Sequence, residues 1–123
     1  MKFKDSKGIF QQIADTICDK ILSKEYKTGD KIPSVRELAS KFGVNHNTIM
    51  RTYMELQHKD IITNRRGVGY FVKENAHKKI WASRRNEFFQ ATLPEFIHFV
   101  DLLNIKKADV KELIKKLEEN EKK

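Results

Sequence analysis

The sequence predicts a mainly α-helical fold with a small β-hairpin, and three observations support that prediction. Apolar residues recur at helical spacing over roughly the first 60 residues, two β-favouring triplets then flank a glycine-bearing segment, and helical spacing resumes over residues 76–123. The length of 123 residues fits one compact domain, or one small domain with an appendage. We therefore expect a first domain over residues 1–75 and a helical segment over residues 76–123.

The first predicted helix spans Ile9 to Leu22. Isoleucine occupies every fourth position, and a second set of apolar residues follows one position behind, as in an amphipathic helix that packs on a core. Cys18 belongs to this second set and is the single cysteine, so it cannot form a disulfide within the chain. We expect it to be a small core residue rather than a redox sensor. The whole stripe consists of Ile9, Phe10, Ile13, Ala14, Ile17, Cys18, Ile21 and Leu22.

The second predicted helix runs from Ser34 to about Phe42. Ile32-Pro33, which precedes it, is expected to be extended, because the residue before a proline avoids the α region. Ser34 and Glu37 have the spacing of a capping box, in which each side chain bonds the backbone of the other residue. This pattern defines the start of the helix.

The third predicted helix follows the second after a short turn. Gly43 is expected to end the second helix, and Asn45 is a good N-terminal cap for the third. The side chains expected to be buried, at helical spacing, are Ile49, Tyr53 and Leu56. Those expected to face outward are Asn47, Thr48 and Arg51.

After residue 60 the spacing changes to that of strands. Ile61–Thr63 and Tyr70–Val72 are β-favouring triplets, and Asn64–Gly69 between them is expected to form a hairpin loop. The loop carries Arg65 and Arg66, and its two glycines permit positive φ and a close approach to a sugar-phosphate backbone. Two helices joined by a glycine-containing turn and followed by such a hairpin have the order of a winged helix-turn-helix.

Residues 76–123 return to helical spacing in three stretches, and we expect this part to be helical. Thr92–Glu95 has the pattern of a helix cap with a proline in the first turn, so we expect a kink or a restart of the helix there. Asn104–Ala108 is expected to be the loop before the last helix, and Glu118–Lys123 is expected to be a frayed end.

Composition limits the function. The chain has 25 basic and 17 acidic residues, a net charge of +8, which favours a polyanionic partner such as nucleic acid or acidic lipid. It shows no signal-peptide core and no apolar run near the roughly 20 residues that span a bilayer, so we expect a soluble cytoplasmic protein without a membrane partner. We find no catalytic constellation. Among the histidines, His98 alone has a possible metal-ligand spacing, with Asp101 three residues on, and we expect surface polar residues rather than a metal site. We expect neither enzymatic activity nor a cofactor.

Four separated motifs together resemble the DNA-binding domain of the GntR family of bacterial transcription regulators: Pro33–Ala39, Phe42–Ile49, Tyr53–Leu56 and Gly67–Val72. The resemblance covers about residues 8–73 and implies a winged helix-turn-helix whose third helix enters the DNA major groove by its N-terminal end. Most members carry a large C-terminal domain. The short C-terminal part of this chain instead resembles the dimerisation segment of the YtrA-like subfamily, whose members are commonly repressors associated with operons that encode ABC transporters.

Residues 45–51 are then the expected base-reading strip. Asn47 can pair bidentately with an adenine, Thr48 can contact a thymine methyl or a phosphate, and His46 can donate to a guanine or a phosphate. The resemblance adds Arg36 from the Pro-Ser-x-Arg motif and Arg66-Gly67 from the wing. The full expected DNA-binding set is Ser34, Arg36, Asn45, His46, Asn47, Thr48, Arg51, Arg65, Arg66, Gly67 and Gly69. The sequence departs from the family at His46, which is often arginine, at Asp60, commonly glycine, and at Thr52, commonly a small residue.

Aromatic residues of the C-terminal part have too little chain around them to be buried within it. We expect a dimer interface, with a ligand cage as the alternative. The expected interface residues are Trp81, Phe88, Phe89, Phe96, Val100 and Leu103. The sequence does not decide whether Arg84 and Arg85 pair across that interface or reach the DNA backbone.

The sequence therefore predicts a homodimeric, sequence-specific regulator, most simply a repressor, that binds a palindromic operator in double-stranded DNA. Two alternatives stay open. One is a regulator that binds a small effector, of unknown identity, between the C-terminal helices of two subunits. The other is a winged-helix protein-interaction module without DNA specificity.

Overall fold

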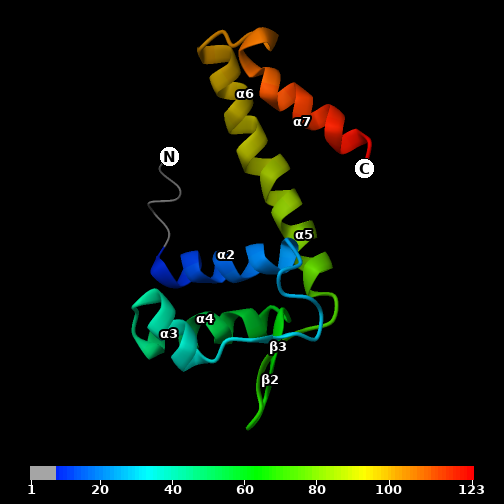
Figure 1. The fold of residues 1–123 in the computed structure, drawn as a ribbon. Helices are drawn as coiled ribbons and strands as arrows, with labels where there is room; N and C mark the ends of the chain where they lie inside the picture. Colours follow the sequence, from blue (N-terminus) through cyan, green and yellow to red (C-terminus); the bar gives the residue numbers. More distant parts are fainter. Residues whose placement is uncertain (1–7) are drawn as a thin grey trace. The chain divides into compact units, whose positions relative to one another are not determined.

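The computed structural model describes residues 8–123, which are mainly helical with one small sheet (Figure 1). Contacts divide the chain into two units that meet between Ser83 and Arg84, inside one helix. The first unit contains α2 (Ile9–Leu22), β1 (Lys31–Ile32), α3 (Val35–Phe42), α4 (His46–His58), β2 (Ile62–Arg65), β3 (Gly69–Val72) and most of α5 (Ala76–Glu87). The second contains the π-helical turn η1 (Phe88–Thr92), α6 (Leu93–Leu102), the 3₁₀ turn η2 (Lys107–Val110) and α7 (Lys111–Glu121). The predicted fold class is confirmed.

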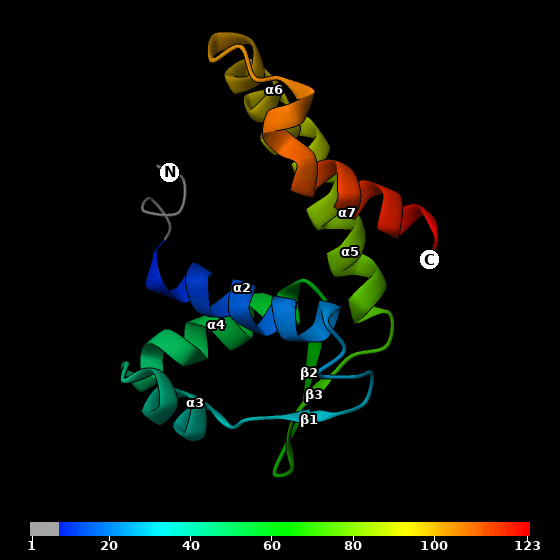
Figure 2. The same cartoon turned by 45° about the horizontal axis from the view of Figure 1, so that its top comes forward.

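Helix α2 has the predicted bounds and buries one face against the rest of the first unit. Ile13, Ile17 and Ile21 are buried, and Cys18 is partly buried against the same core. Ile9, in contrast, is 52% exposed, so the buried stripe begins one turn later than the spacing predicts. In both ribbon views α2 packs along α4 (Figure 1, Figure 2).

The predicted caps of α3 and α4 are present. The Ser34 hydroxyl oxygen accepts a hydrogen bond from the Glu37 N–H at 3.1 Å, and the Ser34 N–H donates to Glu37 Oε1 at 2.8 Å. Helix α3 ends at Gly43, whose φ is 64°. The side-chain oxygen of Asn45 then accepts from the Asn47 N–H at 2.7 Å and begins α4. These polar contacts fix the helix boundaries that the sequence pattern indicates.

The sheet differs from the predicted two-stranded hairpin. It has three antiparallel strands in the order β1-β3-β2, because Lys31–Ile32 pairs with Phe71 and Tyr70 of β3. Strand β2 also continues through Arg65, which is opposite Gly69, so the turn is only residues 66–68 and not the whole of residues 64–69. A two-residue strand that ends before Pro33 is too short to show strand periodicity, which explains why the sequence pattern does not reveal it.

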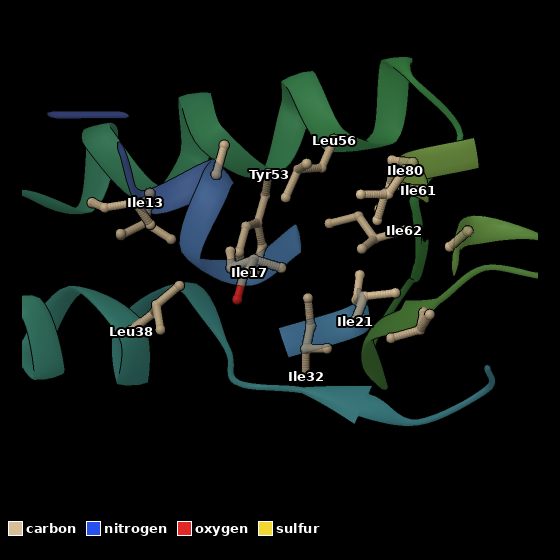
Figure 3. Close-up of a cluster of buried hydrophobic side chains, with 14 of the residues drawn as sticks. Ile13, Ile17, Ile21, Ile32, Leu38, Tyr53, Leu56, Ile61, Ile62 and Ile80 are labelled. Atoms are coloured by element: carbon tan, nitrogen blue, oxygen red, sulfur yellow. The ribbon is translucent and has the colours of Figure 1, made fainter. Parts of the chain in front are cut away.

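One hydrophobic core holds the first unit together, and all its elements contribute to it. Figure 3 shows side chains from the helices and the strands directed into this single cluster. The core residues are Ile13, Ala14, Ile17, Ile21, Ile32, Leu38, Ala39, Ile49, Tyr53, Leu56, Ile61, Ile62, Val72, Ala76 and Ile80. The last two belong to α5, so the beginning of this helix completes the core of the first unit.

The second unit corrects three sequence predictions. Thr92 has helical φ and ψ of −69° and −47° and makes no side-chain cap, so the predicted cap is absent and, of the two expected outcomes, a kink or a restart, the restart does not occur there. A π-helical turn instead precedes α6, and such a wider turn accommodates the missing N–H of Pro94 near the start of α6. The 3₁₀ turn η2 occupies part of the predicted loop, and α7 continues to Glu121 rather than fraying from Glu118.

Over residues 8–123, we find that every helix is too short or too polar to cross a lipid bilayer.

Candidate nucleic-acid interface

Helix α4 has three distinct faces. Ile49, Tyr53 and Leu56 point into the core, with exposed fractions of 0–2%. A second face is directed to α2, where the Thr52 hydroxyl lies 3.3 Å from the Phe10 carbonyl oxygen. The third face is open to solvent and carries His46, Asn47, Met50 and Met54, all exposed. This third face is therefore the part of α4 that is available for contact with a duplex.

Arg51 occupies the border of the face directed to α2. Its guanidinium carbon lies 3.9 Å from the centroid of the Phe10 ring, which is close cation–π stacking. Arg51 is exposed, as the spacing predicts, but the stacking holds its charge against α2 instead of leaving the side chain to move freely. A charge held in this way at the border of α4 suits a phosphate contact better than a base contact.

The polar groups at the start of α4 have unequal roles. The side-chain oxygen of Asn45 is used in the helix cap, and Thr48 is only partly exposed. Asn47 and His46 are exposed at the N-terminal end of the helix, where the positive end of the helix dipole also favours DNA phosphates. Of the residues in the predicted strip, Asn47 and His46 are therefore the best placed to reach base edges.

Helix α3 contributes polar groups at its own N-terminus. Ser34 is engaged in the capping box, and hydrogen bonds from its N–H and its side chain lower the pKa of the Glu37 carboxyl. Arg36 is exposed in the first turn. The Tyr53 hydroxyl donates to the Pro33 carbonyl oxygen at 2.5 Å, which connects the start of α3 to α4.

The wing consists of the three-stranded sheet and the tight turn at residues 66–68, and two arginines lie at or beside this turn. The Val68 N–H donates to the Arg65 carbonyl oxygen at 2.8 Å, and Gly67 has a φ of 78°, which a side chain would disfavour. The Arg65 guanidinium lies 4.4 Å from the centroid of the Phe71 ring, so its position is fixed on the sheet. Arg66 is exposed in the turn itself. The hairpin projects from the helices in both ribbon views (Figure 1, Figure 2).

Lys31 is a wing residue that sequence reasoning missed. A Cβ atom at Gly69 would lie 2.8 Å from Lys31 Cε, so the lysine side chain crosses the strand where the glycine leaves room. The lysine side chain thus reaches the central strand β3 at Gly69, the residue that pairs with Arg65 on β2. The only signal in the sequence is the glycine, and its meaning depends on the pairing of β1 with β3. The wing therefore carries three cationic side chains, not two.

Arg66→Ala is expected to weaken DNA binding by a similar factor on all sequences. Each phosphate contact releases counterions, so the slope of log K against log salt should become shallower by about 0.9. The measurement is fluorescence anisotropy on one duplex at several salt concentrations. Lys122→Ala, which removes one positive charge at the end of α7, is the matched control and should leave the slope unchanged. An unchanged slope for Arg66→Ala would contradict a phosphate contact by the tip of the wing.

Comparison with known proteins identifies the family to which the chain belongs. Residues 9–72, more than half of the chain, match the family model of bacterial regulatory proteins of the gntR family. The chain belongs to the GntR family. The HTH-type transcriptional regulator YhcF of Bacillus subtilis is 40% identical to this GntR-family protein over 114 residues, which cover 93% of each chain. The HTH-type transcriptional repressor YtrA of Bacillus subtilis is 41% identical over 73 residues, covering 59% of this chain and 56% of YtrA.

Solved structures extend the likeness over nearly the whole chain. A GntR family transcriptional regulator from Listeria monocytogenes has a TM-score of 0.68 and 37% identity, covering 91% of this chain and 96% of that one. YtrA from Sulfolobus acidocaldarius, a GntR-family transcription factor, has a TM-score of 0.55 and 31% identity, covering 98% and 96%. The DNA-binding domain of AraR in complex with operator ORR3 has a TM-score of 0.50 and 28% identity, covering 51% and 76%.

This GntR-family protein is a DNA-binding transcription regulator with a winged helix, related to the YtrA-like members. Its family and its relatives are regulators and not enzymes. The membership supports DNA binding over the alternative of a protein-interaction module.

Two departures from the family pattern have structural explanations. Asp60 has a φ of 61°, a conformation that favours glycine but that aspartate also tolerates. Its carboxylate accepts a hydrogen bond from the Lys73 ammonium at 2.9 Å, which lowers the pKa of Asp60. Thr52 is fully buried, and its hydroxyl donates to the Thr48 carbonyl oxygen at 2.8 Å. Both residues act in packing and turn geometry, away from the open face of α4.

Proposed function

We propose that this protein is a cytoplasmic, homodimeric repressor that binds a palindromic operator in double-stranded DNA. The open face of α4 from each copy contacts one half-site, the two wings contact the flanking backbone, and the bound dimer occludes the promoter. The name of the Bacillus subtilis relative YtrA, a repressor, supports the sign of regulation. The resemblance to YtrA-like regulators extends the proposal to an operon that encodes an ABC transporter.

The observation that supports a dimer is the exposure of the side chains in the second unit. Every side chain of residues 84–123 is at least partly exposed, so this unit has no core of its own. Chains of about 40 residues rarely fold without a disulfide, a metal or a partner. Large apolar side chains with exposed fractions of 40–65% here are Phe88, Phe89, Phe96, Ile97, Phe99, Leu102, Leu103, Leu113 and Leu117. A second copy would bury them.

The spacing on α6 fits a continuous contact stripe. Phe96 and Val100 lie four residues apart on one face of α6, and Leu103, three residues further, is the C-terminal cap of the helix and continues that line. Phe89 lies 5.1 Å from Phe88, ring centroid to ring centroid, in an edge-to-face arrangement. The Arg85 guanidinium lies 5.0 Å from the Phe89 ring centroid, so this arginine stacks on one of the proposed interface residues. Trp81, 52% exposed, belongs to the first unit.

Asn47→Ala tests the base-reading part of the proposal. The change removes an amide that can pair with an adenine, so it should cost about 1–3 kcal/mol on the operator and much less on random duplex. Footprinting upstream of the protein's own gene supplies the operator, and anisotropy titrations supply both affinities. Asn120→Ala, near the end of α7, is the matched control. Equal losses on operator and random duplex would contradict base reading by Asn47.

A second candidate function, sensing of a small effector, is favoured by a shallow hollow of about 480 Å³ on the second unit. Its lining residues are Lys107, Ala108, Lys111, Ile114, Lys115 and Glu118. Three lysines beside an apolar floor suit a small anionic molecule. A thermal-shift screen of anionic metabolites should then yield a compound that raises the melting temperature and changes operator affinity. A screen without such a compound would contradict the proposal of effector sensing and leave the DNA-binding proposal intact.

A further inference from the structure

Two exposed methionines stand on the open face of α4. Met50 is 42% exposed and Met54 is 63% exposed, one helical turn apart, and His46 precedes Met50 by one more turn. An exposed apolar residue is ordinary when it is alone. Met50 and Met54 are more informative as a pair, because they lie in line with His46, the first residue of α4, and form an apolar strip within a polar surface.

The packing of α4 fixes the direction of this strip. Tyr53 and Ile49 are buried, and Thr52 and Arg51 are held against Phe10 of α2. Met50 follows Asn47 by three residues and His46 by four, which places the three side chains on the same remaining face. Any duplex that meets Asn47 and His46 therefore also meets Met50.

The charges of the first unit point to DNA, rather than to an apolar protein segment, as the occupant of the strip. The exposed cations at the start of α3 and on the wing are Arg36, Lys31, Arg65 and Arg66. Such a frame attracts a polyanion. Within the major groove the apolar group on a base edge is the C5-methyl of thymine, which an apolar side chain contacts. Methionine is flexible and polarizable, so it can follow the stepped positions of successive methyl groups.

We propose that Met50 recognises thymine, its side chain packing on one or two thymine C5-methyl groups in each half-site, with Met54 extending the contact toward the edge of the site. The inference rests on the proposed function, because it needs α4 to lie in the major groove. It adds a property of the operator: each half-site contains thymine opposite the second turn of α4.

The test removes the methyl group alone. The full chain first selects its preferred duplex from a random library, and each thymine of the selected site is then replaced in turn by deoxyuridine. Anisotropy titrations should show about a fourfold loss of affinity per contacted methyl group. Met50→Ala should bind the thymine and uracil versions of those positions equally. Met54→Ala should reduce the ratio of thymine affinity to uracil affinity by a smaller amount. Ile9→Ala, which shortens a comparably exposed apolar side chain of α2, should keep the wild-type ratio.

The possible outcomes distinguish the role of Met50 from the proposed function. A selected site that the wild-type chain binds equally with thymine and with uracil overturns the role of Met50 and leaves the proposed function standing. A Met50→Ala variant that keeps the full thymine-to-uracil ratio does the same. Failure of the selection to enrich any sequence overturns the proposed function, and the inference with it. Light scattering and thermal melts should match wild type for Met50→Ala, and a changed oligomeric state would assign the strip to a second copy of the chain instead.

Discussion

A chain that carries both Phe96→Asp and Leu103→Asp is expected to be monomeric and to bind its operator about 10²–10⁴-fold more weakly than wild type. Two carboxylates on the proposed stripe of α6 would have to be buried without partners in the dimer, which is strongly unfavourable. A monomer contacts one half-site at a time and so loses the gain in affinity that comes from two linked contacts. Phe96 and Leu103 are 42% and 63% exposed, so the substitutions should not disturb the packing of a single copy.

Light scattering gives the mass and anisotropy gives the affinity. Binding to a duplex with only one half-site is the internal comparison, because it should change little between the variant and wild type. Ile9→Asp places the same charge on an apolar residue of α2 that is 52% exposed, and this control should stay dimeric. A double variant that remains dimeric, or a monomer with full operator affinity, would show that the second unit has another role.

Local signals of the sequence were sufficient for the helices of the first unit. The bounds of α2, the capping box of Ser34 and Glu37, and the cap at Asn45 depend on residues within a few positions of one another. Spacing also identifies the buried face of α4, since the core residue Tyr53 continues the helical repeat from Ile49. For these elements local preference and tertiary packing agree, and the sequence pattern is then reliable.

Contacts between distant residues account for what the sequence did not show. Strand β1 exists because Lys31 and Ile32 pair with β3 about 40 residues later, and the wing position of Lys31 follows from that pairing. The stacking of Arg51 on Phe10 likewise joins two helices. The π-helical turn before Pro94 replaces the predicted cap, because a helix can widen around a proline as well as restart at it. The candidate site is thus predictable in its residues on α4, and much less so in the wing.

Tyr53 connects the parts of the first unit that are expected to contact DNA. It is fully buried on α4, its hydroxyl donates to the Pro33 carbonyl oxygen before α3, and its ring meets the Tyr70 ring of β3 edge to face at 4.7 Å. Tyr53→Ala should therefore lower the free energy of unfolding by about 3–5 kcal/mol, as for other large aromatic residues in a core. That is a large part of the 5–15 kcal/mol typical of a small domain. Urea unfolding followed by circular dichroism measures it.

Tyr53→Phe isolates the hydroxyl. It should cost about 1–2 kcal/mol, because the Pro33 carbonyl loses its donor while the ring packing stays. Operator affinity should fall with it, since the start of α3 is no longer tied to α4. Tyr26→Phe, at a partly buried tyrosine next to the same core, is the matched control. A Tyr53→Phe chain as stable as wild type would show that the bond to Pro33 contributes nothing to folding.

The pH dependence of stability is a second test of the contact between the Tyr53 hydroxyl and the Pro33 carbonyl oxygen. Burial raises the pKa of Tyr53 well above its ordinary value of 10.0, because the phenolate would lose its hydration in the core. The folded state therefore holds the phenol proton more tightly than the unfolded state. The stabilisation is complete below about pH 10 and decreases as the pH rises above it. The difference in unfolding free energy between wild type and Tyr53→Phe should then shrink from pH 8 to pH 11, whereas contributions that are common to both proteins cancel in that difference. A constant difference would mean that water reaches the Tyr53 hydroxyl, so that its contact with the Pro33 carbonyl before α3 is exposed to solvent.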